Sequence, residues 1–398
     1  MGTQERNLDF DAFIDRRGTD CVKYDCAKKF GKPDNLMGFW VADMDFKSPS
    51  CVQETLRGVA EHGVFGYSES GERYFNAVAT WMRERHDFEV KKEWLVKTSG
   101  VVFALAQIVR AFTRPGDAVM IQQPVYPPFM RVIEKNGRRI VSSDLVPDAS
   151  GVYQIDFDDF EAKIVKEQVK LFLMCSPHNP VGRVWTKEEL TRLGEICLKH
   201  KVLIAADEIH HDFSYANNHT VFQTLAPEFA QNCVTCTAPS KTFNTAGLQA
   251  SNLFVANPTL RKLLEDELDA CGCDELNQSG LAATRAAYEG GGEWYEAMLR
   301  YVEGNFDLAV EYINNEIPQV SAVKSQGTYL LWVDFRATGW EEKKIEDVLT
   351  NVAGVWLNNG SMFGPAGRGY QRMNLACSRD YLRKGLEKMR GAMIEALR

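Results

Sequence analysis

The chain has 398 residues and a net charge of −8, and 45% of its residues are hydrophobic and 25% charged. This composition is typical of a globular protein with one large domain or two ordinary ones. The acidic balance argues against nucleic acid as a partner, and because no apolar run reaches about 18 residues, we expect no membrane-spanning helix. Residues 1–20 are polar, so we expect no secretory signal, a cytoplasmic location and reduced cysteines.

From about residue 94 to residue 256, the sequence alternates short apolar runs with helical patterns. In residues 186–200, Thr186 and Glu189 form a capping box ahead of a helix with one apolar face. Apolar runs separated by helices predict a mostly parallel sheet that is covered on both faces. We predict its strands within residues 93–100, 117–124, 170–180, 201–208, 232–240 and 251–258.

The glycine-rich run EGGGE at 289–293 interrupts this pattern and predicts a boundary. After it, GTYLLWVDFR at 327–336 predicts a strand, and the last helix carries Leu382, Leu386, Met389 and Met393 on one face. We therefore predict three parts: an N-terminal segment (1–47) that packs with the small domain, a large domain (48–289) and a small α+β domain (290–398).

Chemically useful residues follow the predicted strands of the large domain. In open parallel α/β sheets, ligands bind at the carboxyl ends of the strands, so these residues are expected to meet around one site. They are the helix start at Gly100, Val101 and Val102, then Tyr126, Asn179, Asp207, His210, Ser240 and Lys241.

As a set, these groups suit one ligand, pyridoxal phosphate. Its aldehyde needs a lysine to form a Schiff base, and its pyridine nitrogen needs a buried carboxylate to stay protonated. Its phosphate suits the free N–H groups of a helix start together with a hydroxyl group, and its ring suits an aromatic neighbour. The sequence thus predicts a site for this cofactor in the large domain.

Each of these residues also has an ordinary explanation when it is taken alone. Asp207 can cap a helix, and Asn179, before a proline, can be a turn residue. The adjacent His210 and His211 would point apart on a strand or helix, which makes a poor pair of metal ligands. Because the CxxC of Cys233 and Cys236 also lacks a second matching pair, we expect no metal.

Longer motifs resemble one known family over almost the whole chain. SPHNPVGRVW (176–185), ADEIHHDF (206–213) and APSKTFNTAGL (238–248) resemble the fold-type-I pyridoxal-phosphate enzymes related to aspartate aminotransferase. Within these enzymes, the chain is most similar to the MalY/PatB group of carbon–sulfur β-lyases. The motifs that extend the resemblance are FWVADMDF (39–46), GYSE (66–69), SGVVFAL (99–105), GTYLLWVDFR (327–336) and RMNLACSR (372–379).

The resemblance implies a role for each candidate residue. Lys241 would form the Schiff base and, once the substrate has displaced it, would remove the Cα proton. Tyr67 would reach the phosphate from a neighbouring subunit, and could protonate the leaving thiolate, so the implied unit is a homodimer with a shared active site. Arg372 would hold the substrate carboxylate, with Asn179 and Trp40 beside the substrate. The other implied cofactor contacts are Asp207 to the ring nitrogen, Asn179 to the phenolic oxygen, Tyr126 to the ring face, and Gly100, Val101, Val102 and Ser240 to the phosphate.

Two positions depart from the pattern of many aminotransferases. This chain has His210 where many relatives have a tyrosine that contacts the phenolic oxygen, and we count His210 among the cofactor-binding residues. It has Gln249 where many relatives have an arginine that binds the phosphate. Both departures favour the lyase group over the main aminotransferase group.

The expected reaction is β-elimination from an L-cysteine S-conjugate such as cystathionine, with release of a thiol, pyruvate and ammonia. Two alternatives stay open at the level of sequence. The same site can run transamination, and the protein can act by binding a regulatory protein. The preferred sulfur substrate is also open, because the residues around it come from loops.

Overall fold

The computed structural model describes residues 8–215, 218–273 and 275–398. Its largest sheet has seven strands in the order β2-β10-β9-β8-β7-β3-β4. Strands β4, β3, β7, β8 and β9 run parallel to one another, whereas β10 is antiparallel to both β9 and β2. The predicted mostly parallel sheet is confirmed. The strands are β2 (Leu95–Thr98), β3 (Ala118–Ile121), β4 (Arg139–Ser142), β7 (Leu171–Cys175), β8 (Leu203–Asp207), β9 (Cys233–Thr237) and β10 (Ser251–Phe254).

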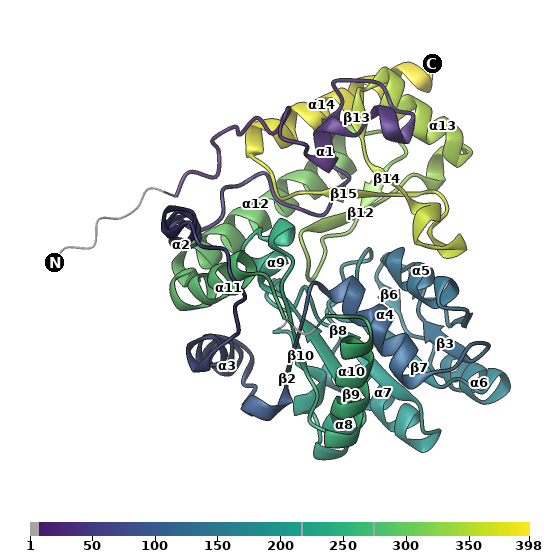
Figure 1. Ribbon diagram of the computed structural model, residues 1–398. Helices are drawn as coiled ribbons and strands as arrows, with labels where there is room; N and C mark the ends of the chain where they lie inside the picture. Colours follow the sequence, from purple (N-terminus) through teal and green to yellow (C-terminus); the bar gives the residue numbers. More distant parts are fainter. Residues whose placement is uncertain (1–7, 216–217, 274) are drawn as a thin grey trace.

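Helices cover both faces of this sheet, as Figure 1 shows. Within β7, Leu171 and Leu173 pack into one apolar cluster with α4, α5 and α10, whereas Phe172 and Met174 pack into another with α6 and α7. This alternation follows from the strand period of two. The predicted capping box opens α7, where Thr186 and Glu189 each accept the other's backbone N–H. These helices are α4 (Val101–Phe112), α5 (Pro128–Lys135), α6 (Phe157–Glu167), α7 (Lys187–Lys199), α8 (Pro227–Gln231) and α10 (Pro258–Ala270).

The glycine-rich run marks a break between two long helices. A single residue, Gly291, separates helix α11 (Gln278–Gly290) from helix α12 (Gly292–Glu316). Helix α11 packs beside α2 (Ser50–His62) and α3 (Glu72–His86). The placement of domain boundaries after residues 47 and 289 stays a prediction.

The C-terminal part contains a second sheet of four antiparallel strands in the order β11-β12-β15-β14. The predicted face of the last helix is buried, because Leu382, Leu386, Met389 and Met393 all lie in the core. The elements are β11 (Ser321–Ala322), β12 (Leu330–Asp334), α13 (Glu342–Asp347), β14 (Asn358–Asn359), β15 (Tyr370–Asn374) and α14 (Arg379–Ala396).

The N-terminal segment lies against this second sheet and its helices. Strand β1 (Met37–Gly38) pairs in parallel with β13 (Val355–Trp356), and Figure 1 shows α1 (Val22–Asp25) beside α14. A short hairpin of β5 (Val146–Pro147) and β6 (Tyr153–Gln154) completes the strands. None of the helices in the described ranges combines the length and apolarity needed to span a membrane.

Candidate active site

A cavity of about 250 Å³ lies at the carboxyl ends of the central strands of the large sheet. Cys175 and Asp207, the last residues of β7 and β8, both lie on its wall. The structure therefore brings together residues that are far apart in the chain. The predicted residues on the wall are Gly100, Val101, Val102, Tyr126, Asn179, Asp207, His210, Ser240 and Lys241.

Lys241 lies on α9 (Pro239–Thr242), the single helical turn that follows β9. Its Nζ donates a hydrogen bond to the backbone carbonyl of Ala42 at 2.6 Å. Burial lowers the pKa of Lys241 to about 8, although the negative charges of Asp43 and Asp207 oppose this shift. An amine that loses its proton this readily can attack an aldehyde or remove a proton from carbon.

Asp207 is buried, with 4% of its surface exposed, and its Oδ1 accepts the N–H of Ile209 at 3.1 Å. Burial raises the pKa of this carboxyl group to about 7, while the cation at Lys241 opposes the shift. A buried carboxyl group gains most from a cationic partner that hydrogen-bonds to it. A protonated ring nitrogen is such a partner, so Asp207 fits the cofactor that the sequence predicts.

His210 also faces the cavity, and its Nδ1 has no hydrogen-bond partner among the described residues. Burial lowers the pKa of this imidazole well below its usual value, so the ring is neutral at physiological pH. Its ring packs edge-on against Tyr329 at 5.6 Å. A neutral imidazole with a free nitrogen can exchange a hydrogen bond with a polar group in the cavity.

The next residue, His211, faces a different set of neighbours, as expected for adjacent side chains that point apart. It lies with His86 and Asp212 in a buried cluster whose metal-ligating atoms fall within 4.8 Å of one another. The carboxylate of Asp212 already accepts hydrogen bonds from Trp81 and Thr242. Because Thr242 follows Lys241 directly, this cluster anchors the turn that carries the lysine.

The start of α4 offers an anion site at the same cavity. Gly100 precedes the helix with a φ of +132°, a conformation that favours glycine. Ser99, Gly100 and Val101 line the wall where the first N–H groups of a helix have no intrahelical partner. Ser240 adds a hydroxyl group to the wall, and Gln249 adds a neutral amide at a position where many aminotransferases have a cation. This donor set fits a phosphate group.

Arg372, on β15, is a buried cation with neutral partners. Its guanidinium donates to the Asn179 side chain at 3.0 Å, to the Trp40 carbonyl at 2.9 Å and to the Asn358 side chain at 2.7 Å. Among the described residues no carboxylate forms an ion pair with it, and its Nε has no hydrogen-bond partner. Burial lowers its pKa to about 10. A buried guanidinium without a counter-ion is suited to bind a carboxylate.

Three predicted residues, Arg372, Trp40 and Tyr67, lie outside the cavity wall in the single chain. Arg372 reaches the wall through its hydrogen bond to Asn179. The ring of Trp40 stacks on Trp356, with centroids 4.1 Å apart and planes at 16°, so only its backbone carbonyl reaches Arg372. Tyr67 is fully exposed to solvent. Its proposed contact with a phosphate therefore needs a second subunit.

Three further residues of the site, Ala42, Tyr329 and Asn358, are not among those predicted from the sequence. Ala42 lies on the wall and accepts the hydrogen bond of Lys241. Tyr329 donates to the same carbonyl at 2.7 Å, and Asn358 holds Arg372. Ala42 and Tyr329 lie in motifs that carried the family resemblance, FWVADMDF and GTYLLWVDFR. Asn358 lies in no such motif, and the sequence contains no signal for it.

Comparisons with known proteins agree with this fold and site. The model of the family "Aminotransferase class I and II" matches residues 34–389. Cystathionine beta-lyase PatB of Bacillus subtilis (strain 168) is 41% identical over 388 residues, which cover 97% of this chain and 100% of that protein. The structure of cystalysin from Treponema denticola, which contains pyridoxal 5'-phosphate, matches with a TM-score of 0.94 and 34% identity, covering 98% of this chain and 100% of that chain.

A third comparison extends the likeness to another enzyme with bound cofactor. The structure of the pyridoxal-phosphate-bound C–S lyase from Staphylococcus hominis matches with a TM-score of 0.92 and 33% identity, covering 99% of this chain and 100% of that chain. The likeness thus extends over the whole length of each of these proteins. The chain belongs to the class I and II aminotransferase family.

Proposed function

We propose that the protein is a pyridoxal-phosphate-dependent carbon–sulfur β-lyase that acts on L-cystathionine or a related L-cysteine S-conjugate. The observation that carries this proposal is its full-length similarity, at 41% identity, to a cystathionine beta-lyase. The cavity supports it, because a reactive lysine and a buried carboxyl group lie on its wall, and the buried Arg372 donates a hydrogen bond to Asn179 on the same wall. The products are a thiol, pyruvate and ammonia, and one water molecule is consumed.

The residues on the wall match the parts of the cofactor. Asp207 would hold the ring nitrogen, Tyr126 the ring face, and Asn179 and His210 would lie near the phenolic oxygen. Gly100, Val101, Val102 and Ser240 would bind the phosphate. When bound, pyridoxal phosphate supplies a ring that accepts electrons from the substrate's Cα.

The chain's own residues then bind the substrate and move its protons. Arg372 binds the α-carboxylate through its planar, two-pronged guanidinium. The Nζ of Lys241 takes the proton from Cα, and its fixed position supplies much of the rate advantage. The carbon–sulfur bond breaks with its electron pair on sulfur. The thiolate then takes a proton from Lys241 or from Tyr67 of the partner subunit.

We further propose that the protein works as a cytoplasmic homodimer with shared active sites. The exposed position of Tyr67 supports a role that only a neighbouring chain can complete. Val64 and Phe65, on the same loop, are also exposed apolar residues that a partner could cover.

The experiment that tests the reaction is incubation of the protein and pyridoxal phosphate with L-cystathionine, with the thiol and pyruvate measured separately. Equal amounts of thiol and pyruvate are expected. Keto-acid formation that depends on an amino acceptor, without thiol release, would instead establish an aminotransferase. Borohydride reduction should fix the cofactor on the peptide that contains Lys241, and the Lys241→Ala variant should stay unlabelled and inactive.

A further inference from the structure

The backbone of residues 41–45, which we call the DMD loop, contacts the lysine of the proposed active site. The Ala42 carbonyl in this loop accepts two hydrogen bonds, from Lys241 Nζ at 2.6 Å and from the Tyr329 hydroxyl at 2.7 Å. A carbonyl with two donors is fixed in direction. It thereby holds the free amine of Lys241, which is the form that moves protons in the proposed mechanism.

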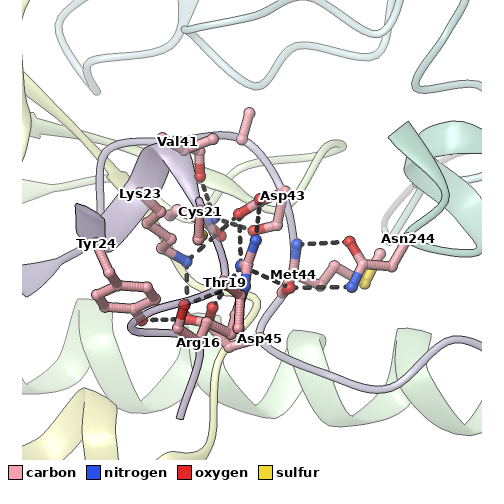
Figure 2. A network of polar contacts seen from close by, with 12 residues as sticks. Arg16, Thr19, Cys21, Lys23, Tyr24, Val41, Asp43, Met44, Asp45 and Asn244 are labelled. Carbon is pink, nitrogen blue, oxygen red and sulfur yellow. Dashed lines mark hydrogen bonds and ion pairs between the residues drawn. The ribbon is translucent and has the colours of Figure 1, made fainter. Parts of the chain in front are cut away.

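A network of charges holds the DMD loop from the N-terminal side (Figure 2). The guanidinium of Arg16 alone spans three consecutive residues. It donates to Asp43 at 2.6 and 3.0 Å, to the Met44 carbonyl at 3.2 Å and to Asp45 at 2.8 Å. One side chain therefore fixes the loop at two side chains and one backbone group.

Lys23 and Tyr24 complete the network. The side chain of Lys23 is 1% exposed, and its Nζ lies 2.7 Å from Asp45 and 3.8 Å from Asp43. The Tyr24 hydroxyl donates to the same carboxylate of Asp45 at 2.9 Å. Burying a lysine costs several kcal/mol in lost hydration. A buried ion pair adds little net stability compared with apolar side chains of the same size. The contribution of Lys23 is therefore the position in which it holds Asp45 and Asp43.

The large domain holds the same loop from the other side. Asn244, three residues after Lys241, accepts the N–H of Met44 at 3.0 Å and donates to the carbonyls of Met44 and Phe46 at 3.0 and 2.8 Å. Figure 2 shows Asn244 and Arg16 on opposite sides of Met44. The loop thus links the N-terminal segment to the turn that carries Lys241.

We propose that Arg16 and Lys23, through Asp43 and Asp45, are positioning residues that fix the Ala42 carbonyl as the acceptor for the free amine of Lys241. The proposal rests on the proposed role of Lys241, but it concerns residues outside the cavity wall. The negative charge of Asp43 also acts on this amine, since it raises the pKa of Lys241 against the effect of burial.

The test measures how fast Lys241 reacts with acetic anhydride at pH 7 in the cofactor-free protein, by mass spectrometry of its peptide. The variant Arg16→Met distinguishes two possible roles of Arg16, because they predict opposite changes in the labelling rate of Lys241. If Arg16 acted only by screening Asp43, its loss would raise the pKa of Lys241 and slow the labelling. If Arg16 positions the loop, its loss releases the amine, and we expect labelling to be faster by about threefold or more.

Two variants serve as controls. Arg16→Lys keeps the charge but cannot span three residues, so we expect a labelling rate between those of the wild type and Arg16→Met. Arg139→Met removes an exposed arginine that pairs with Glu167 away from the site, and its labelling should equal that of the wild type. A cooperative thermal unfolding transition in each variant will establish that the variant is folded.

Unchanged or slower labelling of Lys241 in folded Arg16→Met would overturn the proposal. If that variant fails to fold, wild-type labelling in Arg16→Lys would overturn it.

For Arg16→Met we also expect weaker binding of pyridoxal phosphate and a kcat that falls more than KM rises. Since the labelling needs neither cofactor nor substrate, it reports on positioning even if the lyase reaction were absent.

Discussion

Burial moves the pKa values of Lys241 and Asp207 toward each other, to about 8 and about 7. Both groups lie on one cavity wall, yet no direct ion pair between them is found among the described residues. Near neutral pH, both therefore change their charge over a narrow range. This behaviour suits a site that must receive a cofactor with a reactive aldehyde and a basic ring nitrogen.

The affinity of the cofactor-free protein for pyridoxal phosphate is expected to rise between pH 6 and pH 8. The pKa of Asp207 is raised, so its carboxyl group is still protonated below about pH 7 and cannot pair with a cationic ring nitrogen. The pKa of Lys241 is lowered, so its amine becomes neutral and reactive only toward pH 8. Both effects strengthen binding as the pH rises. The dissociation constant of pyridoxal phosphate, measured by absorbance at each pH, tests this prediction.

Asp207→Asn is the matched variant for this prediction. It removes the charge and keeps the shape, so binding should weaken by about tenfold or more. The part of the pH dependence near pH 7 should disappear, while the part due to Lys241 remains. An unaltered pH profile in this variant would mean that Asp207 does not contact the ring.

Short elements outside the large sheet position the backbone next to Arg372. Strand β1 pairs with β13 through only two residue pairs, Met37 with Val355 and Gly38 with Trp356. Trp356 then stacks on Trp40, and Phe30 packs edge-on against both rings. Because the Trp40 carbonyl accepts from Arg372, this aromatic cluster supports the backbone beside the proposed carboxylate site.

Trp356→Ala is expected to lower the free energy of unfolding by about 3–5 kcal/mol, the usual cost of removing a large buried aromatic side chain. Urea denaturation measures this change. Since Trp40 loses its stacking partner, KM for the amino-acid substrate should also rise, while Trp356→Phe should show smaller changes in both. If Trp356→Ala kept the wild-type free energy of unfolding but had a raised KM, the predicted loss of stability would be wrong, while the effect on substrate binding would stand.

In the molecule as a whole, one predicted site residue lies apart from the others. The structure brings the cavity residues together within one chain, but Tyr67 is fully exposed and lies off the wall. The homodimer that we propose would supply Tyr67 from a partner. Its loop lies between α2 and α3, and Val64 and Phe65 on the same loop are exposed as well.

Mixing two inactive variants tests this arrangement. Lys241→Ala and Tyr67→Ala proteins, dissociated together and refolded, should form mixed dimers that regain lyase activity. One site of each mixed dimer then has a wild-type lysine from one chain and a wild-type tyrosine from the other. Each variant refolded alone stays at its low level, and a mixture that also stays there would exclude a shared site of this kind.

The mostly parallel character of the large sheet, the positions of six of its seven strands and the set of residues at its carboxyl edge could be predicted from the sequence, whereas β4 and the order of the strands were not predicted. Strand, turn and helix patterns are local, so Asn179, Asp207 and Lys241 could each be placed after a strand. Parallel strands bring such ends to one edge whatever the details of packing. The capping box at Thr186 and the buried face of α14 were predictable for the same reason.

Contacts between distant segments could not be predicted in this way. The antiparallel β10, the ring of Trp40 turned toward Trp356, and the partners of Arg372 depend on residues that are tens to hundreds of positions apart. The same is true of the carbonyl of Ala42, since a backbone group has no signature in the sequence. By itself, the sequence determined which side chains reach the edge of the sheet, because that follows from local periodicity. The tertiary structure alone decided which of them are buried, paired or free, because burial and partners arise only when separate segments pack together.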